Sequence, residues 1–233
     1  MDLTFASYNI RKAVGRDRKR DPERILSILS EIGADVVALQ EADRRFGHRL
    51  SVLPPDAIRA AGYHPAPLAG KPQSLGWHGN ALLLRDGIDL VEAHRLDLPT
   101  LEPRGAVRAD LSIDGRRVRV AGMHLDLSGI RRRAQLRSVL SHLADCEGDC
   151  PAVLLGDMNE WLSRRGSLRE FGDGWRVLQP GRSYPARRPL GALDRIVVSP
   201  QWKVAEVAVH HSDLARWGSD HLPVFARLTL PKT

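Results

Sequence analysis

Runs of apolar residues alternate with polar segments along the whole chain, and their spacing predicts a mixture of strands and helices. The first run, residues 3–10, is typical of a strand. A helix is predicted next, because an Asp-Pro pair at 21–22 suits a helix start and Gly33 suits its end. Between them, apolar residues recur at spacings of three and four: Ile25, Ile28, Leu29 and Ile32.

Shorter apolar runs follow and predict further strands, with a second helix after Ser128 that carries apolar residues at 136, 139, 140 and 143. Many antiparallel strands and few helices favour two packed sheets with helices outside, in a single domain spanning 1–233 without a repeat or linker. The predicted strands lie at 35–40, 79–85, several within 88–124 around the turn Asp114-Gly115, 153–155, 193–199, 204–211 and 222–230.

The composition is ordinary for a soluble globular protein, and the sequence has no pattern typical of a membrane-spanning or secreted protein. Hydrophobic residues make up 42% of the 233 residues and charged residues 27%. No apolar stretch approaches the roughly 18 residues of a membrane span. The first residues carry an acid and lead directly into a strand, without the pattern of a signal peptide. We therefore expect no membrane span and a cytoplasmic location.

The two cysteines, Cys146 and Cys150, lie four residues apart. No second Cys or His pair at ligand spacing lies nearby, so the pattern does not support a zinc site. A local disulfide is one alternative, but for a cytoplasmic protein unpaired thiols are the favoured interpretation.

The charge is strongly basic, with a formal net charge of +7. Arginines cluster at 16–20 and at 131–133, which favours a polyanionic partner, although solvated arginine-rich faces are an alternative. The basic segment 11–20 is predicted to be a mobile phosphate clamp, and the segment 183–190 a rim loop. Arginines 131–133 fall in the first turn of the second helix, where positive charge opposes the helix dipole, and this placement suggests anion binding.

Polar residues whose side chains can take part in catalysis or bind a metal lie at the ends of most predicted strands. If these strand ends meet, they bring carboxylate, amide and imidazole groups to one rim, which suits chemistry on phosphate esters. A hard divalent cation needs oxygen ligands, for which Glu41 is the best candidate, with Asn9 and Asp220 beside it. The full set is Asn9, Glu41, Asn80, His124, Asp126, Asp157, Asn159, Asp194, Asp220 and His221.

Seven short motifs, in family order over nearly the whole chain, resemble the endonuclease/exonuclease/phosphatase superfamily of metal-dependent phosphoesterases. Each motif alone is weak, but all seven in order form a strong signal. They are Ser7-Tyr8-Asn9-Ile10, Leu39-Gln40-Glu41, Gly79-Asn80-Ala81, His124-Leu125-Asp126, Gly156-Asp157-Met158-Asn159, Leu193-Asp194-Arg195 and Ser219-Asp220-His221.

The resemblance implies an α/β (α+β) fold, a four-layer sandwich of two mixed β-sheets flanked by helices, with magnesium or manganese at one end. It implies that Glu41, with Asn9, binds the metal and that Asp220 lies near it. Asp157 would orient and deprotonate the attacking water, and Asn159 would hold that water or a phosphate oxygen. His221 would bind the phosphoryl group, oriented by Asp194.

His124 stands where exonuclease III-like abasic endonucleases carry tyrosine. Histidine at this place resembles the deoxyribonuclease I, sphingomyelinase, deadenylase and tyrosyl-DNA phosphodiesterase branches. A protonated His124 would donate to a phosphate oxygen, so we expect it to stabilise charge beside His221. Trp161, after the Asp157 motif, suits either stacking on a substrate ring or packing in the core.

The predicted function is metal-dependent hydrolysis of a phosphodiester bond by an Asp157-activated water, with nucleic acid as the substrate that the charge favours. A phospholipid headgroup or another small phosphodiester is the alternative. A nucleic-acid-binding module without catalysis is a remote alternative, because it requires the loss of a metal or water-activating position and none is replaced. The sequence leaves the oligomeric state open.

Overall fold

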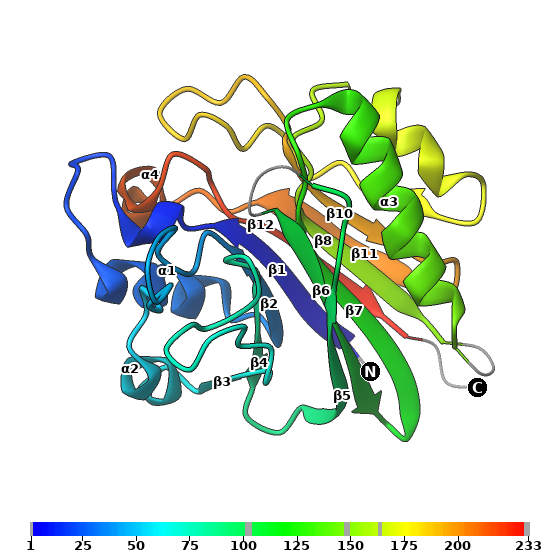
Figure 1. Cartoon of the computed structure of the whole chain (residues 1–233), viewed down its shortest axis with the longest axis horizontal. Coiled ribbons are helices and arrows are strands. Elements are labelled where there is room, and N and C mark those ends of the chain that lie inside the picture. The colour runs from blue at the N-terminus through cyan, green and yellow to red at the C-terminus, as the bar shows by residue number, and fades with distance from the viewer. Residues whose placement is uncertain (1, 101–103, 147–149, 163–164, 231–233) are drawn as a thin grey trace.

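The computed structural model describes residues 2–100, 104–146, 150–162 and 165–230, which form two six-stranded sheets with helices on the outside (Figure 1). The strands are β1 Asp2–Asn9, β2 Val36–Gln40, β3 Tyr63–Pro65, β4 Ala81–Arg85, β5 Asp89–Leu96, β6 Gly105–Ile113, β7 Arg116–His124, β8 Ala152–Asp157, β9 Arg176–Val177, β10 Asp194–Val198, β11 Lys203–Val209 and β12 Val224–Thr229. The helices are α1 Pro22–Ile32, α2 Pro55–Ala60, α3 Gly129–Ala144 and α4 Asp213–Gly218, with 3-10 turns η1 Arg11–Ala13 and η2 Gly166–Phe171.

Both sheets are mixed, and each contains one parallel pair near its centre. The first sheet has the order β11-β12-β1-β2-β4-β3, with β1 parallel to β2. The second has the order β5-β6-β7-β8-β10-β9, with β7 parallel to β8. The predicted four-layer sandwich of two mixed sheets flanked by helices is therefore confirmed.

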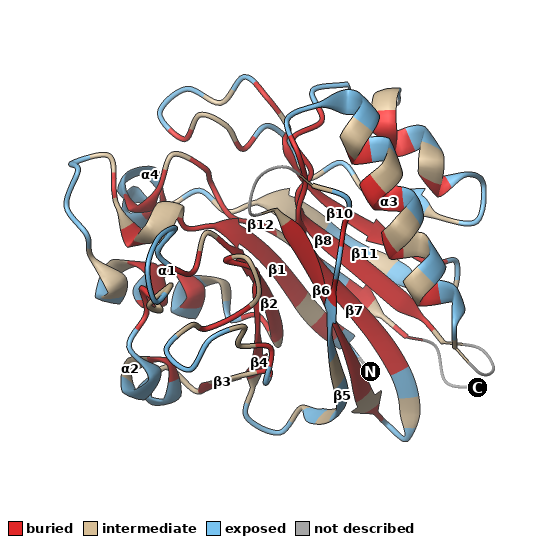
Figure 2. Cartoon of the chain, viewed as in Figure 1, coloured by how far each residue is buried: buried red, intermediate tan, exposed pale blue. Residues whose placement is uncertain are grey.

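Three apolar clusters hold the layers together. Alternation along β1 divides its side chains between two of them: Leu3 and Phe5 face the other sheet, while Ala6 and Tyr8 face α1. A third cluster lies between α3 and the outer face of the second sheet. Figure 2 shows the central strands buried along most of their length. Because both faces of these strands are covered, their sequences are continuous apolar runs.

The two long helices match their sequence signals to different degrees. The Asp21 side chain caps α1 by accepting from the Arg24 N–H at 3.0 Å, and Gly33 ends it with a φ of 65°, as predicted. Ser128 precedes α3 but its side chain makes no capping hydrogen bond, and its backbone N–H donates to the Asp126 carboxylate. The short elements α2, β3, β9 and α4 were not predicted, since each has too few residues to show a period.

Two expectations from composition meet different outcomes. Cys146 and Cys150 are joined in a disulfide, so the favoured interpretation of unpaired thiols is wrong. The backbone brings the two residues within 6.3 Å between Cα atoms, which the four-residue spacing alone does not reveal. Disulfides persist mainly in oxidising compartments. None of the helices in the described ranges is long and apolar enough to cross a membrane.

Gly156 lies where β8 runs closest to the backbone of β7, one residue before Asp157. A Cβ at this position would overlap the carbonyl oxygen of Met123, and the φ of 155° is unfavourable for other residues. We expect Gly156→Ala to lower the free energy of unfolding by about 3 kcal/mol, measured by urea denaturation. Gly174→Ala is the control, because a Cβ there meets nothing within 4 Å, and equal stability of the two variants would contradict the prediction.

Candidate active site

Strands of both sheets end at one edge of the sandwich and carry the predicted polar residues there. Asn9 ends β1 and Glu41 directly follows β2, while His124 and Asp157 end the parallel pair β7 and β8. Strand β10 starts beside them, with Asp194 paired to Asp157 in the antiparallel register. Topology therefore collects residues that are far apart in the sequence.

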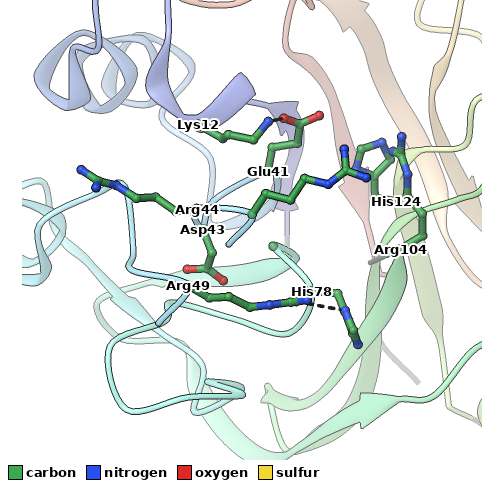
Figure 3. A pocket seen from close by; sticks show the side chains of 10 residues that line it. Lys12, Glu41, Asp43, Arg44, Arg49, His78, Arg104 and His124 are labelled. Carbon is green, nitrogen blue, oxygen red and sulfur yellow. Dashed lines mark hydrogen bonds and ion pairs between the residues drawn. The ribbon is translucent and has the colours of Figure 1, made fainter. Parts of the chain in front are cut away.

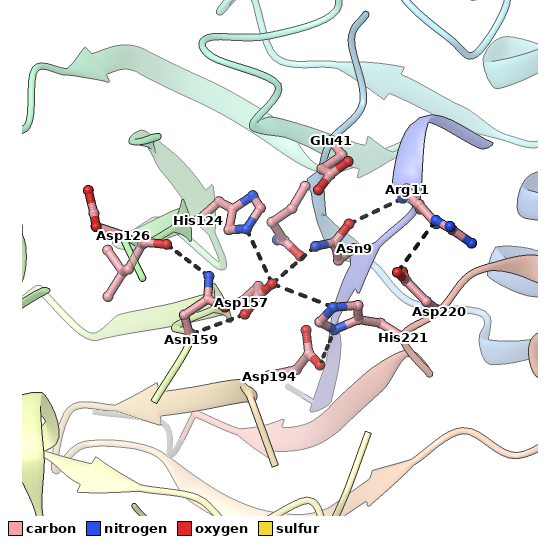
Figure 4. A network of polar contacts seen from close by, with 12 residues as sticks. Asn9, Arg11, Glu41, His124, Asp126, Asp157, Asn159, Asp194, Asp220 and His221 are labelled. Atoms are coloured by element: carbon pink, nitrogen blue, oxygen red, sulfur yellow. Dashed lines mark hydrogen bonds and ion pairs between the residues drawn. The ribbon is translucent and has the colours of Figure 1, made fainter. Parts of the chain in front are cut away.

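The Asp157 carboxylate lies at the centre of this set and is 2% exposed (Figure 4). Its Oδ2 accepts from Asn9 Nδ2 at 3.0 Å, a hydrogen bond that joins the two sheets. The same oxygen lies 3.2 Å from His124 Nε2 and 3.7 Å from His221 Nε2. Its Oδ1 accepts from the Asn159 N–H at 3.0 Å. Asp157 is thus held in one orientation by groups from four segments.

His221 forms a buried acid–imidazole pair with Asp194, at 2.9 Å between Nδ1 and Oδ2. Burial by itself lowers the pKa of His221, but the charge and hydrogen bond of Asp194, together with Asp157 and Asp220, raise it to about 10. The ring is therefore a cation at neutral pH. Ser183 Oγ donates to the same Asp194 oxygen, and the Tyr184 ring packs 4.7 Å from the His221 ring.

His124 has the opposite character although it contacts the same carboxylate. Burial lowers the pKa of its ring to about 3, and the nearby Asp157 offsets only part of this effect. The ring is neutral at neutral pH, and its Nε2 lies 3.2 Å from Asp157 Oδ2. This differs from the expectation of a protonated imidazole, because a sequence motif carries no information about desolvation.

Asn159 lies two residues after Asp157 in a left-handed backbone conformation, with a φ of 49°. Its side-chain Nδ2 donates to the Leu125 carbonyl at 2.9 Å, which links the loop after β8 to the loop after β7. One amide hydrogen and the Oδ1 oxygen are left for a further partner. Asn159 is therefore brought to the site as predicted.

The predicted metal ligands lie on the other side of Asp157, facing two cations of η1. Glu41 pairs with Lys12, and Asp220 lies 3.4 Å from Arg11 Nε. The Asn9 Oδ1 oxygen accepts from the Arg11 N–H at 3.1 Å. Two carboxylates and an amide oxygen are the donors that a hard divalent cation prefers, and each of them already faces a positive or donor group. The residues present therefore fit such a cation.

A second group of potential ligand atoms, from Asp157, Asp194 and His221, lies within 4.8 Å of one another. An imidazole binds metal only when it is deprotonated, whereas the Asp194 pair keeps His221 protonated. This buried group is therefore better suited to hold a proton and an anionic oxygen than a cation.

Backbone strain is concentrated at the site. Nine described residues other than glycine have a positive φ, and they include Arg11, Lys12, Glu41 and Asn159. Such conformations cost about 1–3 kcal/mol each and cluster where function requires them. The strain turns the chain sharply after β1, β2 and β8, which is how side chains at strand ends are directed to one place.

The basic segments behave differently from the sequence-based expectations. Arg132 points inward and pairs within the protein rather than with an external anion: its guanidinium lies 3.2 Å from the Glu160 carboxylate and also contacts Ser167. The prediction of anion binding by the whole triplet 131–133 is therefore wrong for its central member. In segment 11–20, the first two cations face Glu41 and Asp220, and binding of phosphate by this segment stays a prediction.

Some residues near the site were not predicted to contribute, and two that were named serve the local backbone. Ser183 and Tyr184 contact Asp194 and His221, and Ser219 donates to the Asn9 carbonyl at 2.7 Å. Ser183 and Tyr184 lie in the predicted rim loop and Ser219 in the last motif, but the sequence assigns them no contacts, because their partners are distant along the chain. Asn80 instead donates to the Trp77 carbonyl, and Asp126 holds the Ser128 N–H.

Comparisons with known proteins identify the family and the fold. The Endonuclease/Exonuclease/phosphatase family matches residues 6–221. A search of curated proteins found no match.

Several solved structures share the fold at low sequence identity. A Bacteroides vulgatus endonuclease/exonuclease/phosphatase is 18% identical with a TM-score of 0.78, covering 99% of this chain and 100% of that one. The human Nocturnin catalytic domain with bound sulfate anion is 19% identical with a TM-score of 0.76, over 99% and 95% of the two chains. D. rerio TDP2 complexed with single strand DNA product is 19% identical with a TM-score of 0.73, over 98% and 99%. With a family match across most of its length, the chain belongs to the Endonuclease/Exonuclease/phosphatase family and is an enzyme of that family of phosphoester hydrolases.

Proposed function

We propose that this enzyme hydrolyses a phosphodiester bond in a polyanionic substrate, first of all nucleic acid, with Mg²⁺ or Mn²⁺ as its cofactor. The observation that carries the proposal is the position of Asp157. Its carboxylate lies between the cationic imidazole of His221 and the side-chain amide of Asn9. The Asn9 amide in turn belongs to the group of oxygen donors suited to a divalent cation. A base, an acid and a metal site are thereby combined at one point.

Each residue has a role that follows from its contacts. Asp157 accepts a proton from the attacking water, and Asn159 holds that water or a phosphate oxygen with its remaining amide groups. The cationic His221 donates through Nε2 to the phosphoryl oxygens, where negative charge increases during attack. Asp194 holds the His221 ring and keeps its proton. The neutral His124 orients Asp157.

The metal would be held by Glu41 and Asn9, with Asp220 beside them. When bound, the cation supplies Lewis-acid neutralisation of charge on the phosphate oxygens. Binding requires Lys12 and Arg11 to release the two carboxylates that they contact. Lys12 and Arg11 are then free to turn toward the substrate phosphate. Metal binding and phosphate binding at this site are therefore compatible.

Two observations support nucleic acid as the substrate. The net charge of +7 favours a polyanion. The fold is shared with D. rerio TDP2, whose structure holds a single strand DNA product. We also propose that residues 1–233 act as one catalytic domain, because both sheets supply residues to the site.

Removal of the metal tests the proposal directly. We expect cleavage of bis(4-nitrophenyl) phosphate and of labelled single-stranded DNA to stop in EDTA and to return with Mg²⁺ or Mn²⁺. Glu41→Gln should raise the metal concentration for half-maximal activity by about tenfold or more, because one carboxylate charge is lost. Glu206→Gln, an exposed change on β11, serves as the control. Full activity in EDTA would refute the proposed metal site.

A phospholipid headgroup is the second candidate substrate, and exposed apolar side chains beside the site favour it. Trp161 is 60% exposed and its ring contacts the edge of the Tyr184 ring, which in turn packs on His221. Trp161 is therefore not a core residue. Large exposed apolar side chains near an active site suit a substrate with an apolar part. The exposed apolar side chains of the segments that follow β7 and β8 and precede β10 are Leu127, Ile130 in the first turn of α3, Trp161, Leu162 and Leu190.

Parallel assays separate the two candidates. The purified enzyme is supplied with Mg²⁺ and either single-stranded DNA, RNA or vesicles of mixed anionic and neutral phospholipids, and released product is measured. Faster turnover of nucleic acid supports the first candidate, and release of headgroups from vesicles supports the second. A protein that binds DNA in a salt-dependent way without any product would instead be a binding module.

A further inference from the structure

A cavity opens beside the active site, on the side of β2 and β4 (Figure 3). Its volume of about 60 Å³ is several times what a single water requires. Glu41 and His124 line both this cavity and the active site, whereas Asp157, Asn159 and His221 do not line it. We call it the anion pocket, and its charged and polar walls are Lys12, Glu41, Asp43, Arg44, Arg45, Arg49, His78, Arg104 and His124.

The charge of the anion pocket is strongly positive. Five of its walls are lysine or arginine, against two carboxylates. Both carboxylates are already occupied: Asp43 accepts from the Leu75 and Gly76 N–H groups, and Glu41 pairs with Lys12. Cationic side chains therefore outnumber carboxylates among the walls of the anion pocket, next to the residues that flank the reacting phosphate.

Arg44 shows this excess most directly. Within the described ranges its guanidinium makes no hydrogen bond or ion pair, and only its backbone N–H is used, by the Leu50 carbonyl. Figure 3 shows Arg49 turned toward His78 and Arg104 beside His124, whereas the Arg44 side chain extends away from both and has room to turn toward a ligand. Arginine presents a planar fork of donors that matches phosphate oxygens.

The backbone around the anion pocket is strained in the same way as the active site. Glu41, Arg49 and His78 have φ values of 55°, 51° and 50°. Arg49 Nη1 also lies 3.1 Å from His78 Nδ1, so these two walls hold each other in place. Strain at several walls of one cavity indicates that their positions serve function rather than local preference.

We propose that the anion pocket binds a second phosphate group of the substrate, adjacent to the phosphate that is hydrolysed; this rests on the proposed function. The pocket shares Glu41 and His124 with the active site, so a substrate with phosphates in series spans both. The second phosphate is either a terminal monoester or the next diester along a strand. In both cases the enzyme prefers substrates with two phosphates over those with one.

The test compares four short thymidine substrates under identical Mg²⁺. TpT carries one phosphate, pTpT and TpTp add a 5′- or 3′-terminal monoester, and TpTpT adds a second diester. We expect the wild type to have a higher kcat/KM for at least one of the last three than for TpT. Arg44→Gln should reduce that preference by about tenfold, mainly through KM, because Arg44 is an exposed wall of the anion pocket outside the catalytic set and would bind only the second phosphate. The preferred substrate distinguishes a monoester from a diester.

Arg227→Gln, on the exposed face of β12, is the matched control and should keep the wild-type preference. An unchanged preference in Arg44→Gln would overturn the proposal. Pyrophosphate binding to the EDTA-treated protein, followed by calorimetry, separates this proposal from the catalytic one. If no substrate is cleaved but pyrophosphate binds about tenfold more weakly to Arg44→Gln, the proposed function fails and the pocket stands. Equal binding to both proteins refutes the pocket.

Discussion

Asp157→Asn is expected to lower kcat/KM for bis(4-nitrophenyl) phosphate by about a thousandfold, because an amide cannot take a proton from the attacking water. The substitution keeps the size of the side chain. The remaining oxygen can still accept either from Asn9, which donates to Oδ2, or from the Asn159 N–H, which donates to Oδ1, so at most one of these two hydrogen bonds is lost and the fold should persist. The measurement is steady-state hydrolysis at saturating Mg²⁺, with circular dichroism to check the structure.

Asp173→Asn provides the control for this prediction, since it removes an equivalent charge from an exposed position outside the site. It should retain wild-type hydrolysis. Wild-type activity in Asp157→Asn would exclude Asp157 as the base and would place the activation of water elsewhere.

Asp194→Asn is expected to change the pH dependence as well as the rate. Asp194 is the main influence that raises the pKa of His221 to about 10 against the opposing effect of burial. Without this charge, burial lowers the pKa, and the imidazole loses its proton as the pH rises through neutrality. Activity that needs the protonated ring should therefore fall by about a hundredfold at pH 8.5 and much less at pH 6.

The wild type should show no loss from His221 deprotonation until the pH approaches 10, because its ring stays protonated below that value. His221→Gln serves as the comparison, since it has no titrating ring and should be equally inactive at both pH values. A parallel loss in Asp194→Asn at pH 6 and pH 8.5 would show that Asp194 is structural and does not control the protonation of His221.

The opposite protonation of His124 and His221 explains why both can contact Asp157. Each ring lies within 4 Å of Asp157 Oδ2, at 3.2 and 3.7 Å. Only His221 has a second carboxylate, Asp194, and that partner outweighs desolvation. Groups whose pKa values are separated by their environments divide the work of proton transfer. We therefore assign charge stabilisation to His221 and orientation of the base to His124.

Much of the fold and site was predictable from local patterns. The helix 21–32 was predicted because its cap, apolar period and terminal glycine lie within one short segment. Most strands were predicted from apolar runs, with bounds that differ by one or two residues. Polar residues at strand ends were identified because parallel neighbours such as β1 with β2 direct their ends to the same edge.

Contacts between distant segments were not predictable. Arg132 was expected to bind an anion, but only the folded chain places Glu160 beside it. His78 belongs to none of the seven sequence motifs, yet it lines the anion pocket with arginines from two other segments. The protonation of His124 was likewise inferred wrongly, because desolvation depends on everything packed around the ring.

The sequence by itself therefore determined the chemical groups at the strand ends and their order, since hydrophobic period and short motifs are local properties. Only the tertiary structure decided which group holds a proton, which cation faces which acid, and where a second anion is expected to bind. Those properties depend on distance and dielectric between residues far apart in the sequence; Asn9 and Asp157, for example, are separated by 148 positions.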